Sequence, residues 1–285
     1  MLSSILKLLL LIVGGFILAQ LLTLGVMMSM GLEISNDSLG KASSFTVKSI
    51  LFISHICTFI LPCLLFVYLN YREKKWNLLR LDKVPNAKIL VLFLLFLMVS
   101  YPAVSYSFTV NSWIPLADWM VSQEQSTADT LEKVLTMNNT LDFLSVIMII
   151  AIIPAIGEEL LFRGLIMDFI EQSTLNGHIA VWGSAIIFSL FHLQFQGFLP
   201  RLLLGAVLGY AFLYSRNLWV PIILHLLNNA APVVSLYFFK TDLAAIDPND
   251  TPEIPWYAGL ASLVLGVAVL YFIIQLIKND KSAEA

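Results

Sequence analysis

The stretch LDFLSVIMIIAIIPAIGEELLFRGLI, residues 141–166, is long and apolar enough to cross a bilayer, yet it contains Glu158, Glu159 and Arg163. A spanning helix needs about 20 apolar residues, and each ionisable side chain inside the membrane costs roughly a few kcal/mol, so it usually has a partner or a task. Pro154 lies just upstream. Because proline lacks an N–H, it frees a backbone carbonyl and can kink the helix. A kink beside buried acids predicts a polar cavity within the membrane.

The composition of the whole chain is that of an integral membrane protein. Of its 285 residues, 59% are hydrophobic and 12% are charged, and the mean hydropathy is +0.85. Soluble domains carry about 25% charged residues, so this composition excludes a disordered chain, a nucleic-acid binder and an ordinary soluble enzyme. Besides the stretch above, we expect seven more spans: Leu8–Leu32, Ser49–Tyr71, Ile89–Ala117, His178–Phe195, Leu202–Ser215, Asn217–Phe239 and Ile254–Ile277. The predicted fold is all-α, a polytopic membrane protein of about eight transmembrane helices with an intramembrane active-site cavity.

The charges of the loops predict which way these helices point. The loop Tyr71–Lys88 holds six of the sixteen Lys and Arg residues, and short basic loops stay in the cytoplasm. The loops Thr109–Asp142 and Lys240–Glu253 are mainly acidic and are placed outside. Eight spans with both termini in the cytoplasm satisfy all three loops. We therefore expect a multi-pass protein, placed in the bacterial plasma membrane, with a short surface helix in the loop 111–140.

Two further spans carry a histidine with a second motif residue four positions away. His192 follows Phe188 by four residues, and Asn229 follows His225 by four. Side chains at this spacing share one face of a helix, as do Glu159 and Arg163, which can form an ion pair. The neighbours Phe52 and Phe59, one turn from His55, offer it no hydrogen bond, and we interpret His55 as structural.

These polar groups lie at depths that let them meet near or below the membrane midplane, on the cytoplasmic side. A carboxylate beside a histidine can take a proton from water, and a histidine with an asparagine can donate hydrogen bonds to an oxyanion. Together they would hydrolyse a peptide bond. Glu158, His192 and His225 could also ligate a divalent metal such as zinc, although the His-Glu-x-x-His pattern is absent from the sequence.

Three motifs occur in order on successive spans: Glu158-Glu159-x-x-x-Arg163, Phe188-x-x-x-His192 and His225-x-x-x-Asn229. Over about residues 141–240 they resemble the CAAX prenyl protease and bacteriocin-processing intramembrane proteases, the CPBP or Abi family. The resemblance implies that Glu158 activates water with help from His192. It implies that His225 and Asn229 form the oxyanion hole, and that Glu159 and Arg163 support the site and bind the substrate terminus.

The domain and function predictions follow from this resemblance. Residues 1–140 would be N-terminal helices with an outer loop, 141–240 a catalytic four-helix core, and 241–285 an outer loop with the last helix. The partners would be membrane lipids and a membrane-anchored protein or peptide substrate, with no nucleic acid. Two alternatives stay open: an ion-coupled transporter, which broken helices in matching halves would support, and a protease-like membrane scaffold or immunity protein.

Overall fold

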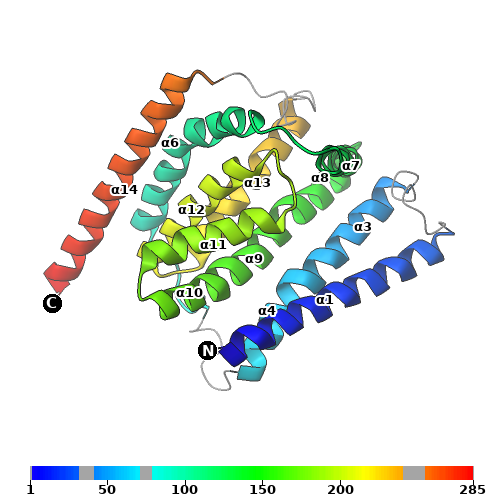
Figure 1. Ribbon diagram of the computed structural model, residues 1–285, viewed down its shortest axis with the longest axis horizontal. Helices are drawn as coiled ribbons and strands as arrows, with labels where there is room; N and C mark the ends of the chain where they lie inside the picture. Colours follow the sequence, from blue (N-terminus) through cyan, green and yellow to red (C-terminus); the bar gives the residue numbers. More distant parts are fainter. Residues whose placement is uncertain (1, 32–41, 71–78, 240–253, 285) are drawn as a thin grey trace.

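The computed structural model describes residues 2–31, 42–70, 79–239 and 254–284, with side chains to residue 279 (Figure 1). Helices make up these parts of the chain, and no strand occurs in them. The helices are α1 (Leu2–Ser29), α3 (Ser44–His55), α4 (Leu61–Asn70), α6 (Ala87–Ser112), α7 (Asp118–Leu135), α8 (Thr140–Val146), α9 (Ile153–Glu159), α10 (Met167–Thr174), α11 (Gly177–Phe191), α12 (Phe198–Ser215), α13 (Trp219–Phe239) and α14 (Trp256–Glu284). The all-α prediction is confirmed.

Seven continuous helices in the described residues are long and apolar enough to cross a membrane: Leu2–Ser29, Ser44–Asn70, Ala87–Ser112, Thr140–Thr174, Phe198–Ser215, Trp219–Phe239 and Trp256–Asn279. They confirm a polytopic membrane protein. The eighth expected span is present as α11, which has only 15 residues. At 1.5 Å per residue it is about 22 Å long, less than the hydrocarbon thickness of about 30 Å.

Two of the loops that carried the topology prediction lie partly or wholly outside the described residues. The first is residues 71–78 of the basic loop, and the second is the whole acidic loop of residues 240–253. The third loop is described, and it contains the predicted surface helix, α7. Ser44 donates to the carbonyl of Lys133 at 2.9 Å, so the end of α7 rests on the first turn of α3.

The helices form a layered arrangement around α9 to α13. Figure 1 shows α14 and α6 along one side of these central helices, and α1 and α3 along the other. Within the centre, α12 approaches α11 closely, because a Cβ atom added at Gly205 would lie 3.1 Å from Cβ of Ala185. At Gly209 the added Cβ would lie 3.0 Å from Val181 Cγ1. Small residues at such a spacing let two helices pack backbone to backbone.

Three short π-helical turns interrupt the described helices near the predicted polar residues: η1 (Ile56–Ile60), η2 (Ile147–Ile152) and η3 (Leu160–Ile166). Such turns are rare and frequently occur at functional sites. Here η1 directly follows His55, η2 leads into Pro154, and η3 directly follows Glu159. Together η2, α9, η3 and α10 continue α8 as one interrupted helix over residues 140–174.

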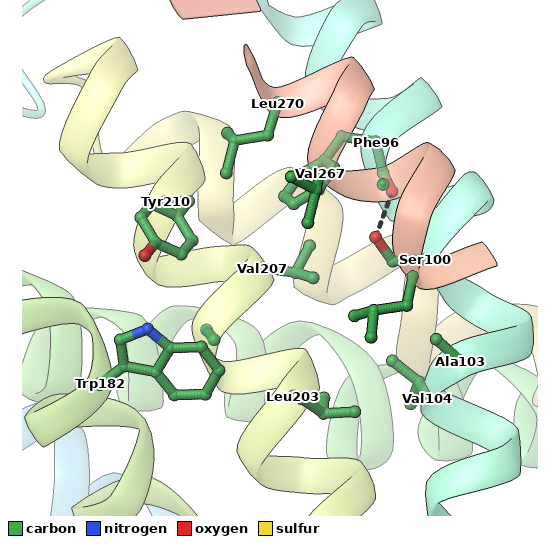
Figure 2. A pocket seen from close by; sticks show the side chains of 13 residues that line it. Phe96, Ser100, Ala103, Val104, Trp182, Leu203, Val207, Tyr210, Val267 and Leu270 are labelled. Atoms are coloured by element: carbon green, nitrogen blue, oxygen red, sulfur yellow. Dashed lines mark hydrogen bonds between the residues drawn. The ribbon is translucent and has the colours of Figure 1, made fainter. Parts of the chain in front are cut away.

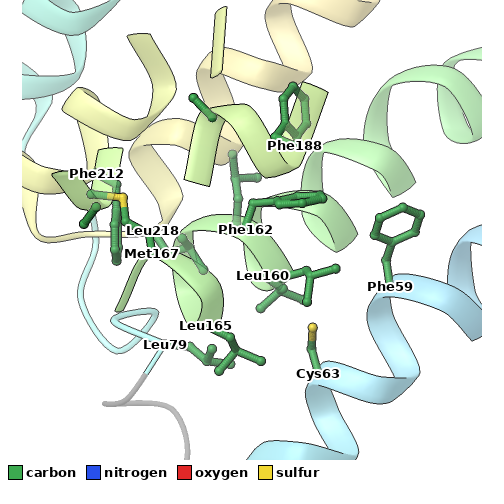
Figure 3. Packing of buried hydrophobic residues seen from close by; sticks show 14 of the residues in the cluster. Phe59, Cys63, Leu79, Leu160, Phe162, Leu165, Met167, Phe188, Phe212 and Leu218 are labelled. Atoms are coloured by element: carbon green, nitrogen blue, oxygen red, sulfur yellow. The ribbon is translucent and has the colours of Figure 1, made fainter. Parts of the chain in front are cut away.

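The main hydrophobic core lies behind η3 and joins it to the N-terminal helices (Figure 3). Phe162 of η3 is fully buried and meets Phe188 of α11 edge to face, with ring centroids 5.1 Å apart. Phe59 of η1 and Cys63 of α4 belong to the same cluster. This packing fixes the depth and rotation of the helix segment that carries Glu158 and Glu159.

Candidate active site

Glu158 is the point at which the predicted site residues meet. Its carboxylate is 6% exposed and lies on α9. Oε2 is 3.9 Å from Nε2 of His192, at the end of α11, and 3.8 Å from Nε2 of His225, on α13. The first and second motifs therefore converge on one carboxylate oxygen, together with the histidine of the third.

Glu159, the second carboxylate, faces the protein interior instead. Its Oε1 accepts hydrogen bonds from Arg163 Nη1 at 2.7 Å and from His225 Nδ1 at 2.8 Å. The side chains of Glu159 and Arg163 have no exposed surface. The predicted pair with Arg163 therefore forms, and the same oxygen also fixes the ring of His225. The two adjacent acids have different surroundings because successive helical residues point about 100° apart.

In the described part of the chain, the partners of Arg163 are buried groups of the protein itself. Its Nη2 donates to the carbonyl of Gly205 on α12 at 2.9 Å, and its guanidinium lies 4.8 Å from the ring centroid of Phe188. A cation over an aromatic face is stabilised, most of all where water is excluded. Since the side chain is fully buried, the geometry supports the expected structural role and gives no support to contact with a substrate terminus.

His192 has a defined orientation. Its Nδ1 lies 2.9 Å from the carbonyl oxygen of Phe188. A carbonyl can only accept, so Nδ1 carries the proton and Nε2 is turned toward Glu158. The imidazole is 27% exposed, more than the 3% of His225. His192 is thus the member of this pair that water can reach more easily.

Asn229 contacts the kinked helix rather than Glu158. Its Nδ2 donates to the carbonyl of Ile150 at 3.2 Å, and its Oδ1 accepts from Asn228 Nδ2 at 3.1 Å. Pro154, four residues after Ile150, has no N–H to give to that carbonyl. The carbonyl that the sequence predicted to be freed is therefore bonded by the asparagine of the third motif. One N–H of the Asn229 amide remains for another acceptor.

His55 is a site residue that sequence reasoning missed. Its Nε2 lies 3.4 Å from Oε1 of Glu158, although the two residues are 103 positions apart. The interpretation of His55 as structural is therefore wrong, because it considers only the neighbours on its own helix, such as Phe52 and Phe59. Its partner comes from another helix, and the signal that could have indicated it is that an ionisable side chain inside a membrane span rarely lacks a partner.

The possible metal ligands, Glu158, His192 and His225, are spread wider in this structure than the ligands of a tetrahedral metal site. Ligands held at about 2.0–2.1 Å in a tetrahedron are about 3.4 Å from one another, whereas both histidine Nε2 atoms are 3.8 Å or more from Glu158 Oε2. Throughout residues 2–31, 42–70, 79–239 and 254–279, no three His, Cys, Asp or Glu side chains are grouped to hold a metal ion.

A second feature is an apolar pocket formed by α11 and α12 with α6 and α14 (Figure 2). Its walls include Phe96, Trp182 and Leu270. None of the predicted catalytic residues lines it. The polar cluster around Glu158, rather than this apolar pocket, is the candidate active site.

Comparisons with known proteins match the part of the chain that holds this cluster. Residues 140–231 match the family described as Type II CAAX prenyl endopeptidase Rce1-like. A protein of Bacillus subtilis (strain 168) named "Putative membrane peptidase YdiL" is 36% identical over 92 residues, 31% of this chain. The aligned segment spans about a third of that relative, 36% of its length. No solved structure matches. These matches confirm the resemblance that the three motifs indicate: residues 140–231 are similar to the Rce1-like CAAX prenyl endopeptidases.

Proposed function

We propose that this protein is an intramembrane endopeptidase that hydrolyses a peptide bond of a membrane-associated protein or peptide with water activated by Glu158. One observation carries the proposal: an almost fully buried carboxylate lies within 3.9 Å of three histidine nitrogens inside a helix bundle of membrane-spanning length. The similarity of residues 140–231 to CAAX prenyl endopeptidases supports the same reaction class.

Glu158 Oε2 and His192 Nε2 are the two groups that would activate the water. A water molecule hydrogen-bonded to Glu158 Oε2 gives its proton to that oxygen as its own oxygen forms a bond to the carbonyl carbon of the substrate. His192 Nε2, with Nδ1 bonded to the Phe188 carbonyl, is oriented to accept a hydrogen bond from the same water. The proton held by Glu158 then passes to the leaving amine as the C–N bond breaks, which restores the carboxylate.

His225 and Asn229 are the proposed donors to the oxyanion. His225 Nδ1 donates its proton in a hydrogen bond to the Glu159 carboxylate, so Nε2 donates to the oxyanion when the ring carries a second proton. The second N–H of the Asn229 amide is not used by the Ile150 carbonyl. Donors placed in a water-poor site before the reaction begins are usually the largest electrostatic contribution to acyl transfer.

We also propose the roles of the remaining segments and the location. Residues 141–240 would form the catalytic core, with residues 1–140 and 241–285 as membrane helices around it. The protein would lie in a bacterial plasma membrane with both termini in the cytoplasm, and its partners would be membrane lipids and the anchored substrate. No group of His, Cys, Asp and Glu side chains that could hold a metal ion is found in the described residues, and no observation favours the transporter.

The test is a direct cleavage assay. The protein and its Glu158→Gln variant are purified in detergent and incubated with a library of membrane-anchored peptides, and mass spectrometry detects the products. We expect cleavage by the wild type and at least about a 100-fold loss in Glu158→Gln, since a general base contributes about 10²- to 10⁴-fold. Glu171→Gln is the matched control. Glu171 lies on the same interrupted helix as Glu158, but its carboxylate bonds Arg216, away from the cluster. Near-normal cleavage by Glu158→Gln would refute the proposal.

A further inference from the structure

The carboxylate of Glu158 has different neighbours on its two oxygens. Oε2 faces His192 and His225, while Oε1 is 3.4 Å from Nε2 of His55. His55 is the last residue of α3 and lies outside residues 140–231, the part that resembles the peptidases. An N-terminal helix thus supplies a hydrogen-bonding group to the proposed base.

The ring of His55 is held in place by aromatic packing. It stacks on Phe59 of η1, with centroids 5.2 Å apart and planes 24° apart. Phe59 meets Phe191 of α11 edge to face at 5.3 Å and lies 6.4 Å from Phe162 of η3. Figure 3 shows Phe59 pointing from its helix toward Phe162 and Phe188. The imidazole therefore cannot turn without disturbing contacts that reach the core.

Gly157 allows α3 and η1 to approach Glu158 this closely. A Cβ atom added at Gly157 would lie 3.0 Å from Phe59 Cβ and 3.1 Å from Ile60 Cγ1. The Cβ of Phe59 is attached directly to the backbone, so it cannot swing aside as the end of a long side chain can. A larger residue at position 157, directly before Glu158, would push η1 away.

We infer that His55 is a positioning residue of the proposed hydrolase, donating its Nε2–H to Oε1 of Glu158 so that Oε2 is the oxygen that takes the proton from water. The inference rests on the proposed function. A carboxylate has two equivalent oxygens and a broad preference for rotation about its last bond. A donor on Oε1 removes that freedom and keeps Oε2 between His192 and His225.

The hydrogen bond from His55 to Glu158 also persists through the proton transfer. When Oε2 takes the proton from water, Oε1 becomes the carbonyl oxygen of a neutral acid and can still accept from His55. The hydrogen bond is therefore kept on both sides of the transfer, and the group does not need to reorient before it returns the proton to the leaving amine. The N-terminal helices thus complete the active site, and a chain reduced to residues 141–240 would lack this donor.

Three substitutions separate positioning from packing. His55→Phe keeps an aromatic ring against Phe59 but removes the donor, His55→Gln supplies an amide donor, and His178→Phe is the control. His178 bonds Tyr210 on α11 and α12, away from Glu158. In the cleavage assay we expect His55→Phe to lower kcat about 10- to 100-fold, because it loses a hydrogen bond to a charged group. KM should stay within about twofold of the wild type, because His55 does not touch the substrate. His55→Gln should recover part of kcat, and His178→Phe should match the wild type.

An infrared measurement makes the inference testable apart from turnover. The carboxylate band of Glu158 is isolated as the difference between the wild type and Glu158→Gln, and the same difference is recorded in each His55 and His178 background. We expect His55→Phe to shift this band, and His178→Phe to leave it unchanged. An unshifted band, or wild-type kcat in His55→Phe, overturns the role of His55 while the proposed function stands. If Glu158→Gln cleaves normally, the proposed function fails, and the positioning role fails with it.

Discussion

His225 donates its Nδ1–H to Glu159 across the interface of α13 and α9, with 2.8 Å between nitrogen and oxygen. The same carboxylate oxygen accepts from Arg163 at 2.7 Å. Neutral imidazole has one N–H, so this bond decides which nitrogen of His225 faces Glu158. The adjacent acids therefore have different roles: Glu159 fixes Arg163 and the ring of His225, and Glu158 faces the histidines His55, His192 and His225.

Glu159→Ala should destabilise the protein strongly, because it leaves the buried guanidinium of Arg163 without its counter-charge. Removing one partner of a buried ion pair costs about 3–5 kcal/mol. The measurement is the midpoint of thermal unfolding in detergent. The control is Glu171→Ala, which breaks the pair with Arg216, whose side chain is 42% exposed. Exposed pairs contribute about 0–1 kcal/mol, so equal losses in the two variants would contradict the prediction.

Asn229→Ala should lower both stability and turnover. It leaves the part-buried Ile150 carbonyl without the amide donor, which costs about 1 kcal/mol, the typical net value of one hydrogen bond. It also removes the N–H that we assign to the oxyanion. Asn228→Ala removes only the bond from Asn228 to the Asn229 side chain and should have a smaller effect on both. Unfolding midpoints and kcat are measured on the same samples, and the prediction fails if Asn228→Ala is the more damaging substitution.

The sequence predicted much of this site because its signals are local. Glu159 and Arg163 are four residues apart on one helix, and each charge inside a membrane span is conspicuous against its apolar neighbours. Pro154 also has a local signature, because a proline has no N–H to give to the carbonyl four residues before it. The pairing of that carbonyl with Asn229 joins two helices, and no spacing within one helix specifies it.

What the sequence could not predict depends on tertiary packing. His55 meets Glu158 only because Gly157 lets η1 approach and Phe59 holds the imidazole. The π-helical turns that directly follow His55 and Glu159 also have no clear sequence signature. The length of α11 was overestimated for a related reason: the apolar run continues to Phe195, but the helix ends at Phe191. Leu193 then turns into the left-handed region, with φ of 52°.

Gly157→Ala should reduce turnover more than it reduces folding. The new methyl group would lie 3.0 Å from Phe59 Cβ, so η1 must move by a few tenths of an ångström, and His55 would move with it. Overpacking of this kind costs about 1–3 kcal/mol. Gly14→Ala on α1 is the matched control, since nothing lies within 4 Å of a Cβ added there. The prediction is contradicted if Gly157→Ala keeps wild-type kcat in the cleavage assay.

The last prediction concerns α11, on which the number of crossings depends. The loop before α11 lies on the side of the basic loop, because Glu171 pairs with Arg216 and the amide of Leu218 donates to the carbonyl of Arg80. The loop after α11 lies against α7, where Glu124 accepts from the amide of Gln196 at 3.1 Å. If α11 crosses, the two loops face opposite sides of the membrane, and all eight helices put the termini on one side.

Single cysteines at Leu175 and Leu193, which are 91% and 61% exposed, report on the two loops. The only native cysteines, Cys57 and Cys63, are buried and should react slowly. With an impermeant thiol reagent on sealed vesicles of known orientation, we expect Leu175→Cys to be labelled from the cytoplasmic side, following the positive-inside rule, and Leu193→Cys from the outer side. Val84→Cys should label with Leu175→Cys, since Val84 is 91% exposed beside the Arg80 segment. Labelling of both loops from one side would mean that α11 enters and leaves by the same face, that seven helices cross, and that the termini lie on opposite sides.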